Sequence, residues 1–225
     1  MVQEIALVVG LLVAVGLLGF YLNRQSWKSI LKNYEALGNK YGLDLTQPEA
    51  KMLGLFRASP YLHGHWNRRE TSVQTLGSGM KNTRQSGTAI FMETALREDC
   101  VMLIRSKKGL NRLERNEFKN LTKVNGPTEA FNKRVLIATN RPEWVSEKIT
   151  SSMCERILED LGSTSGTINL IKGRLGYQEL GILSGAAAYE RMDRMMTHLN
   201  WLANSLEDGE PGTLGKTIED DPTSI

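Results

Sequence analysis

Apolar residues run without a charged position from Ile5 to Leu22 at the start of the chain. Eighteen residues in a helix span about 27 Å, close to the roughly 30 Å hydrocarbon core of a bilayer. A helix also satisfies its own backbone hydrogen bonds, as a segment in lipid must. The pattern predicts a transmembrane anchor over residues 1–23. A cleaved signal peptide is less favoured, because the start is acidic at Glu4 and the run ends in bulky Phe20–Leu22.

The pattern then changes to helical spacing, which predicts an amphipathic juxtamembrane helix over residues 24–42. Its apolar positions are Trp27, Ile30, Leu31, Tyr34, Leu37 and Tyr41. Gly42 is a natural end, because glycine readily adopts the left-handed conformation that closes many helices.

Between residues 61 and 109 the chain offers short runs typical of antiparallel strands joined by turns. The runs are YLHGHW, ETSVQTLG, TAIFMETAL and CVMLIRS. A tight turn is expected at Asn67–Arg68, and the glycine-rich stretch Gly77–Gly87 is expected to be a hairpin tip. Further strands are predicted over residues 134–139, 168–171 and 177–180.

Two helices are predicted to close the domain, one from Pro142 to Leu161 and one over residues 186–206, each with an apolar stripe. The fold class is therefore α+β: one N-terminal transmembrane helix followed by an antiparallel sheet packed with two C-terminal helices. The soluble domain is expected over residues 43–206. Residues 207–225 are acidic and rich in Gly, Pro and Thr, which predicts a disordered tail.

Charge predicts the orientation of the anchor. The cations Arg24, Lys28 and Lys32 follow the apolar run, whereas none precedes it. Because excess Lys and Arg normally lie on the cytoplasmic side, we expect a single-pass protein of the inner (cytoplasmic) membrane, with its N-terminus outside and its soluble domain in the cytoplasm. Two distant cysteines, Cys100 and Cys154, form no disulfide framework and suit a reducing compartment as buried thiols.

Small residues recur every fourth position in the apolar run, at Ala6, Gly10 and Ala14. Such spacing lets a second helix approach closely and is a candidate helix-packing face. The alternative is that glycine and alanine are simply common in membrane helices, and this alternative is favoured.

Candidate chemistry is sparse. His63 and His65 would share one side of a strand, and His198 on the last helix could complete a three-nitrogen metal site, although nothing in the sequence forces them together. The loop Gly77–Gly87 lacks the Gly-Lys-Ser/Thr phrase of a phosphate-binding loop. The basic run Arg105–Lys108 lacks a nucleic-acid-binding pattern. We therefore expect no cofactor, no nucleic acid and no catalytic role.

Four segments together resemble a class of uncharacterised bacterial single-span membrane-anchored domains. The segments are Ala36–Gly42 (ALGNKYG), His65–Gly87, Phe131–Arg134 and Pro142–Leu206. In that class Phe131–Arg134 corresponds to a strand, and an acidic residue often stands where this chain has Asn132. The resemblance implies an α+β domain held under a membrane, without an assigned activity.

Three functions remain in order of preference. The first is a non-catalytic accessory or scaffold subunit whose cytoplasmic domain docks on an integral-membrane protein complex. The second is a sensor domain that binds a ligand or anionic lipid at the inner membrane surface, and the third is a metal-dependent enzyme.

Overall fold

The computed structural model describes residues 2–49, 58–78, 85–107, 120–161 and 164–208. Five helices and nine strands lie in these ranges. The helices are α1 Val2–Tyr41, α2 Glu129–Arg134, α3 Pro142–Lys148, α4 Ser151–Leu161 and α5 Ala186–Glu207. The strands are β1 Asp44–Thr46, β2 Tyr61–Trp66, β3 Arg69–Ser78, β4 Gln85–Glu93, β5 Met102–Ser106, β6 Thr122–Val124, β7 Val135–Thr139, β8 Thr167–Ile171 and β9 Arg174–Leu180.

All nine strands form one antiparallel sheet in the order β1-β2-β3-β4-β9-β8-β5-β7-β6. The expected turn at Asn67–Arg68 is confirmed: both residues have positive φ, 50° and 66°, and they join β2 to β3. Two-residue turns of this hand match the twist of the strands that they connect. The predicted mixture of an antiparallel sheet with C-terminal helices is likewise confirmed.

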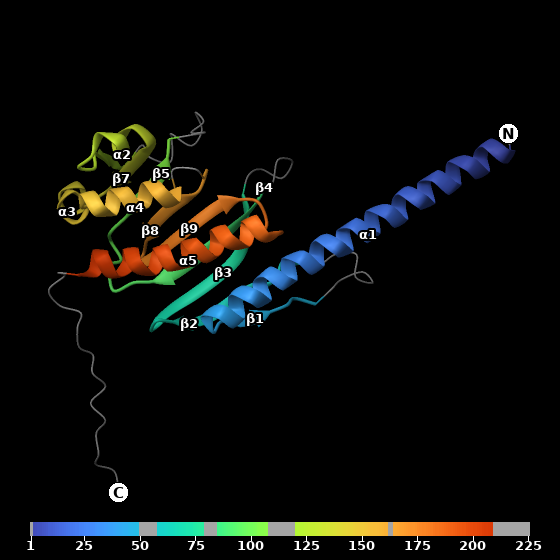
Figure 1. Ribbon diagram of the computed structural model, residues 1–225, viewed down its shortest axis with the longest axis horizontal. Coiled ribbons are helices and arrows are strands. Elements are labelled where there is room, and N and C mark those ends of the chain that lie inside the picture. Colours follow the sequence, from blue (N-terminus) through green and yellow to red (C-terminus); the bar gives the residue numbers. More distant parts are fainter. Residues whose placement is uncertain (1, 50–57, 79–84, 108–119, 162–163, 209–225) are drawn as a thin grey trace, which may run out of the picture.

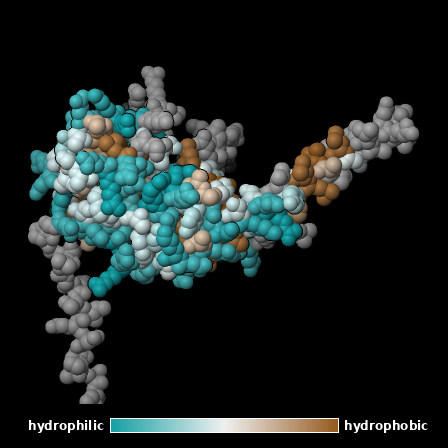
Figure 2. All heavy atoms as spheres, viewed as in Figure 1, coloured by the Kyte–Doolittle hydropathy of each residue, from teal (hydrophilic) through white to brown (hydrophobic). Residues whose placement is uncertain are grey.

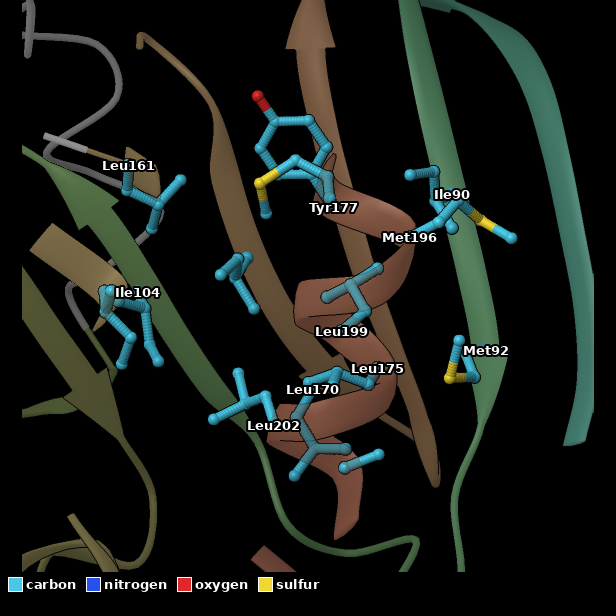
Figure 3. Packing of buried hydrophobic residues seen from close by; sticks show 14 of the residues in the cluster. Ile90, Met92, Ile104, Leu161, Leu170, Leu175, Tyr177, Met196, Leu199 and Leu202 are labelled. Atoms are coloured by element: carbon cyan, nitrogen blue, oxygen red, sulfur yellow. The ribbon is translucent and has the colours of Figure 1, made fainter. Parts of the chain in front are cut away.

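The core lies between the sheet and the helices (Figure 1). Figure 3 shows Met196 of α5 beside Ile90 of β4, and Leu199 and Leu202 of α5 near Leu175 of β9. All five of these side chains have no exposed surface. In β5 and β8 every second residue is buried, because successive side chains of a strand point to opposite faces of the sheet.

The N-terminal apolar run and the amphipathic helix after it form one element. A single uninterrupted helix runs from Val2 to Tyr41, so the boundary expected between residues 23 and 24 falls in mid-helix. The stretch Asn23–Trp27 contains neither proline nor glycine, and nothing there breaks the helical hydrogen bonds. Within the described parts of the chain, no helix has both the length and the apolar character needed to cross a membrane. The expected transmembrane helix is therefore not supported here.

The helix expected from Pro142 to Leu161 is wrong as a single element. It is divided into α3 and α4, because Ile149 is extended (φ −79°, ψ 102°) and a new helix begins at Ser151, after Thr150. The Thr150 hydroxyl accepts a hydrogen bond from the Met153 backbone N–H at 3.3 Å, as an N-cap residue does. Threonine before two serines was the available signal.

The segment Phe131–Arg134 is helical in α2, not a strand as the resemblance implied. Asn132 explains part of this result: its side-chain amide donates to the Gly126 carbonyl at 2.8 Å and accepts from the Gly126 N–H at 2.7 Å. An ionised carboxylate only accepts hydrogen bonds, so the amide fits this loop as an acidic residue cannot. Strands β1 and β6, with three residues each, were not expected.

Candidate functional site

The candidate site begins with the free part of α1, which projects away from the domain (Figure 1). Figure 2 shows a strongly apolar stretch along this projecting part. Leu11, Leu17 and Leu18 are 61%, 65% and 59% exposed, and Phe20 and Tyr21 are similarly accessible. Isolated exposed apolar residues are ordinary, but a contiguous apolar surface of this kind normally meets a membrane or a partner.

The other end of α1 belongs to the domain core. Tyr34 and Leu37 have no exposed surface, and Ile30 is 9% exposed. A Cβ atom on Gly38 would lie only 3.1 Å from Leu62 Cδ2, so the helix sits tightly against β2. The transition between the free and packed parts falls around Trp27–Ile30. The sequence-predicted amphipathic face is therefore used for packing within this chain.

Polar contacts fasten α1 to α5 and to the loop before it. Asn33 Nδ2 donates to the carbonyl oxygens of Leu183 and Gly185 at 3.3 and 2.9 Å. The Gly185 N–H donates to Ser29 Oγ at 3.2 Å. These bonds lie at the point where α1 leaves the domain.

A second set of contacts lies near the C-terminal end of α1. Lys40 Nζ pairs with Asp193 Oδ1 at 2.5 Å, and the Tyr41 hydroxyl donates to the same carboxylate oxygen at 2.8 Å. Burial is the main cause that raises the pKa of Tyr41 above its usual range, and this hydrogen bond to Asp193 is the second. The phenol therefore stays protonated. α1 is thus held at two places along α5.

The predicted cations Arg24, Lys28 and Lys32 are all exposed on α1, four residues apart. Residues four apart share one helix face, so they form a cationic stripe beside the domain. Of the predicted packing face, Gly10 and Ala14 are exposed, and a Cβ atom on Gly10 would meet nothing within 4 Å. The side chain of Ala6 lies outside the described residues. The roles of these residues remain predictions.

The three histidines occupy different surroundings. His63 and His65 are exposed on β2, and His63 Nδ1 lies 3.1 Å from the Asp44 carbonyl oxygen. His198 is buried in α5, where its Nδ1 contacts Asp160 of α4. Across the described ranges, no group of three or more His, Cys, Asp or Glu residues is arranged to hold a metal ion.

Asp160 joins α4 to α5, and sequence reasoning missed it. Its carboxylate contacts His198 through Oδ2, and its Oδ1 lies 3.8 Å from Arg194 Nε. His198 in turn packs edge-on against Trp201, and the Arg156 guanidinium lies 4.2 Å from the centre of that indole ring. The only signal in the sequence was that Asp160 falls on the apolar side of the helical pattern of α4. This position does not indicate which residue its carboxylate contacts.

A charged groove lies over this cluster, with a volume of about 550 Å³. Its lining is polar: Ser152, Glu155, Arg156, Glu159, Asp160, Arg194 and Thr197. Asp160 and the two arginines already have interaction partners within the fold, whereas Glu155 and Glu159 are exposed at the surface. The groove therefore presents two outward carboxylates, which suit a basic segment better than an anion.

Several other expected features can be located. The predicted glycine-rich tip is partly taken up by β3 and β4, and residues 79–84 lie outside the described ranges, together with Lys108 of the basic run and most of the expected tail. Cys100 and Cys154 are both buried, as predicted. Burial, as the main cause, and the negative charge of Glu155, as the second, raise the pKa of Cys154 to about 11. The Cys154 thiol is therefore mostly protonated at neutral pH and is not activated as a nucleophile.

The arrangement defines a class of fold rather than an activity: an antiparallel sheet covered by helices, with a long N-terminal helix that projects from it. No family model and no curated protein matches the sequence. Among solved structures, the fold is similar to the crystal structure of the mycobacterial trehalose monomycolate transport factor A, TtfA. The TM-score is 0.55 at 10% sequence identity, over 80% of this chain and 95% of that chain. At this identity the likeness concerns the fold alone.

Proposed function

We propose that this protein is a non-catalytic, membrane-anchored accessory subunit whose domain docks on an integral-membrane protein complex. One observation carries the proposal: α1 is a single uninterrupted helix that has exposed large apolar side chains between Leu11 and Tyr21, while its last part is embedded in the domain core. A soluble domain has no need of such an appendage. An apolar rod fused to a core suits a protein that is held at a membrane.

The similarity to a transport factor supports an accessory role. The solved structure is named for a factor in trehalose monomycolate transport, and its fold spans most of this chain. We propose that this chain likewise assists a transport process without carrying out a reaction. The proposed location is the inner membrane, with the N-terminus outside and the domain in the cytoplasm, as the cations after residue 23 favour.

The groove between α4 and α5 is the proposed docking site for the partner. Cytoplasmic loops of membrane proteins carry an excess of Lys and Arg, and the exposed carboxylates Glu155 and Glu159 complement such loops. They stand one helical turn apart on α4 and can contact one basic segment together. We propose that a basic cytoplasmic loop of the partner occupies this groove.

The test is purification of the full chain, tagged after Ile225, from its native membranes in a mild detergent. The expected result is a stoichiometric integral-membrane partner whose recovery falls in the double variant Glu155→Lys/Glu159→Lys. The matched control is Glu143→Lys/Glu147→Lys, because these glutamates are also exposed and one turn apart, on the neighbouring helix α3. If partner recovery falls equally in both double variants, the groove is refuted as the docking site. If the chain is recovered as a monomer without a partner, the docking function is refuted.

The alternative is a sensor of anionic lipid, favoured by the exposed stripe Arg24, Lys28 and Lys32. Each cation close to an anionic bilayer contributes about 1 kcal/mol, and salt weakens this attraction. Under this alternative, the fluorescence of the full chain in vesicles responds to phosphatidylserine content and to salt. If the fluorescence changes with neither phosphatidylserine content nor salt, the lipid-sensor function is excluded.

A further inference from the structure

The loop between β9 and α5 is unusual in its composition and exposure. Residues 180–189 read LGILSGAAAY and contain no charged side chain, in a chain with 24% charged residues. Leu180 is 56% exposed and Ile182 is 38% exposed, while Leu183 between them and the helix is buried. The loop thus turns two large apolar side chains outward.

The contacts of α1 place this loop at the point where the helix emerges from the domain. Ser29 and Asn33 bond to Gly185 and to the neighbouring Leu183 carbonyl. Ser29 lies seven residues after Leu22, which is about 10 Å along a helix. Polar headgroup layers add about 5–8 Å to each side of the hydrocarbon core. A bilayer that holds α1 up to Leu22 would therefore come close to this loop.

The direction of α5 agrees with this placement. α1 meets Gly185 at Ser29 and meets Asp193 at Lys40, so the two helices run side by side in the same direction (Figure 1). The N-terminal end of α5 therefore faces the same way as the free part of α1. The first turn of α5 carries no acidic residue, so no carboxylate there opposes an anionic surface.

We propose that the segment Leu180–Gly185, the end of β9 and the loop that follows it, is a second membrane contact in which Leu180 and Ile182 enter the headgroup region. This segment is here called the apolar pole. This inference rests on the proposed anchoring by α1. Lipid is the occupant because the pole adjoins the helix that would enter the bilayer, and because the exposed cations Arg24 and Lys28 lie on the connecting stretch. Apolar side chains typically insert about 5–10 Å into this boundary. Two contacts then fix how the domain is rotated about α1.

The experiment uses the full chain in vesicles of phosphatidylcholine and phosphatidylglycerol that contain no other protein. An environment-sensitive fluorophore is attached at Ile182→Cys, and a lipid with a headgroup nitroxide serves as the quencher. The matched control is Ile171→Cys, since Ile171 is also an exposed isoleucine, at 44%. It lies at the far end of the β8–β9 hairpin, opposite Arg174 and about 20 Å from Leu180 along the strand. The unsubstituted chain, with its two buried thiols, gives the background.

The expected result is a blue-shifted emission and a loss of intensity at residue 182, with neither change at residue 171. Flotation of the vesicles is measured in the same samples. If the protein floats but residue 182 behaves like residue 171, the apolar pole is refuted while anchoring stands. If the protein does not float, anchoring fails and the pole fails with it. If residue 182 becomes shielded only in native membranes, a protein covers the pole and lipid is excluded as its occupant. A label at Leu180→Cys repeats the test where substitution at residue 182 impairs folding.

Discussion

The buried end of α1 provides the most direct test of the architecture, through the substitution Leu37→Ala. Leu37 has no exposed surface and is surrounded by the core that β2 shares with α1. If the last part of α1 is an integral part of the domain, this substitution must destabilise the whole domain. If α1 merely leans on the domain, only the helix end will loosen.

The expected cost follows from the lost burial and from the cavity that remains. Burying a leucine side chain contributes roughly 1.5–3 kcal/mol, and an unfilled cavity adds to the cost of its removal. The neighbouring Gly38 already lies close to the Leu43 carbonyl oxygen and to Leu62, so the helix has little room to move in and fill the space. We therefore expect a loss of about 2–5 kcal/mol in the free energy of unfolding. Alanine is the better helix former, so helix propensity cannot account for such a loss.

The measurement is thermal unfolding of the full chain in a mild detergent, followed by circular dichroism and tryptophan fluorescence. A loss of about 2–5 kcal/mol corresponds to a fall of roughly 4–20 °C in Tm for a domain of this size. Glu35→Ala is the control, because Glu35 is exposed on the same helix and should change stability by less than about 0.5 kcal/mol. A Tm for Leu37→Ala equal to that of the control would show that α1 is not part of the cooperative core.

Two further outcomes are expected. A Cβ atom on Gly166 would lie 2.3 Å from Tyr177 Cε2. Gly166→Ala should therefore lower the free energy of unfolding, measured by thermal unfolding, by about 1–3 kcal/mol. The control Gly10→Ala should cause no such loss, because a Cβ atom there would meet nothing within 4 Å. Because the pKa of Cys154 is raised to about 11, only about one thiol in a thousand is ionised at pH 8. Titration with a chromogenic disulfide reagent should therefore detect Cys154 and the buried Cys100 only after unfolding; rapid reaction of the folded chain would contradict this.

The sequence predicted the elements whose periodicity is long or whose turn chemistry is specific. The β2–β3 hairpin follows from Asn67–Arg68 between two alternating runs, and α5 follows from an apolar stripe of nearly five turns. The elements that were missed depend on single local contacts. The division of α3 from α4 rests on the Thr150 cap, and α2 rests on the bonds between Asn132 and Gly126. Such contacts become decisive only once the chain is packed.

The candidate site was harder to predict, because its parts come together only through the topology. His198 was foreseen as a possible metal ligand, but its neighbour in the fold is Asp160, 38 positions away, and it lies apart from His63 and His65. Periodicity placed Asp160 on a helix without indicating what it would face. The apolar pole was also missed, because Leu180 and Ile182 are consistent with an ordinary strand end. Only the bonds from Ser29 and Asn33 reveal that this loop lies beside α1.

The continuity of α1 bears directly on the proposed function. From Leu22 to Ile30 a helix advances about 12 Å in one fixed direction. A flexible linker of eight residues would have an end-to-end distance of about 14–17 Å in any direction, so the domain would sample many orientations. The uninterrupted helix removes that freedom, and the bonds of α1 to Gly185 and Asp193 fix its rotation against the domain. A groove that is presented in one orientation meets a membrane-embedded partner at a higher effective concentration than one on a loose tether. Inserting a flexible glycine-serine segment after Gln25 should therefore reduce partner recovery while leaving the fold of the domain intact.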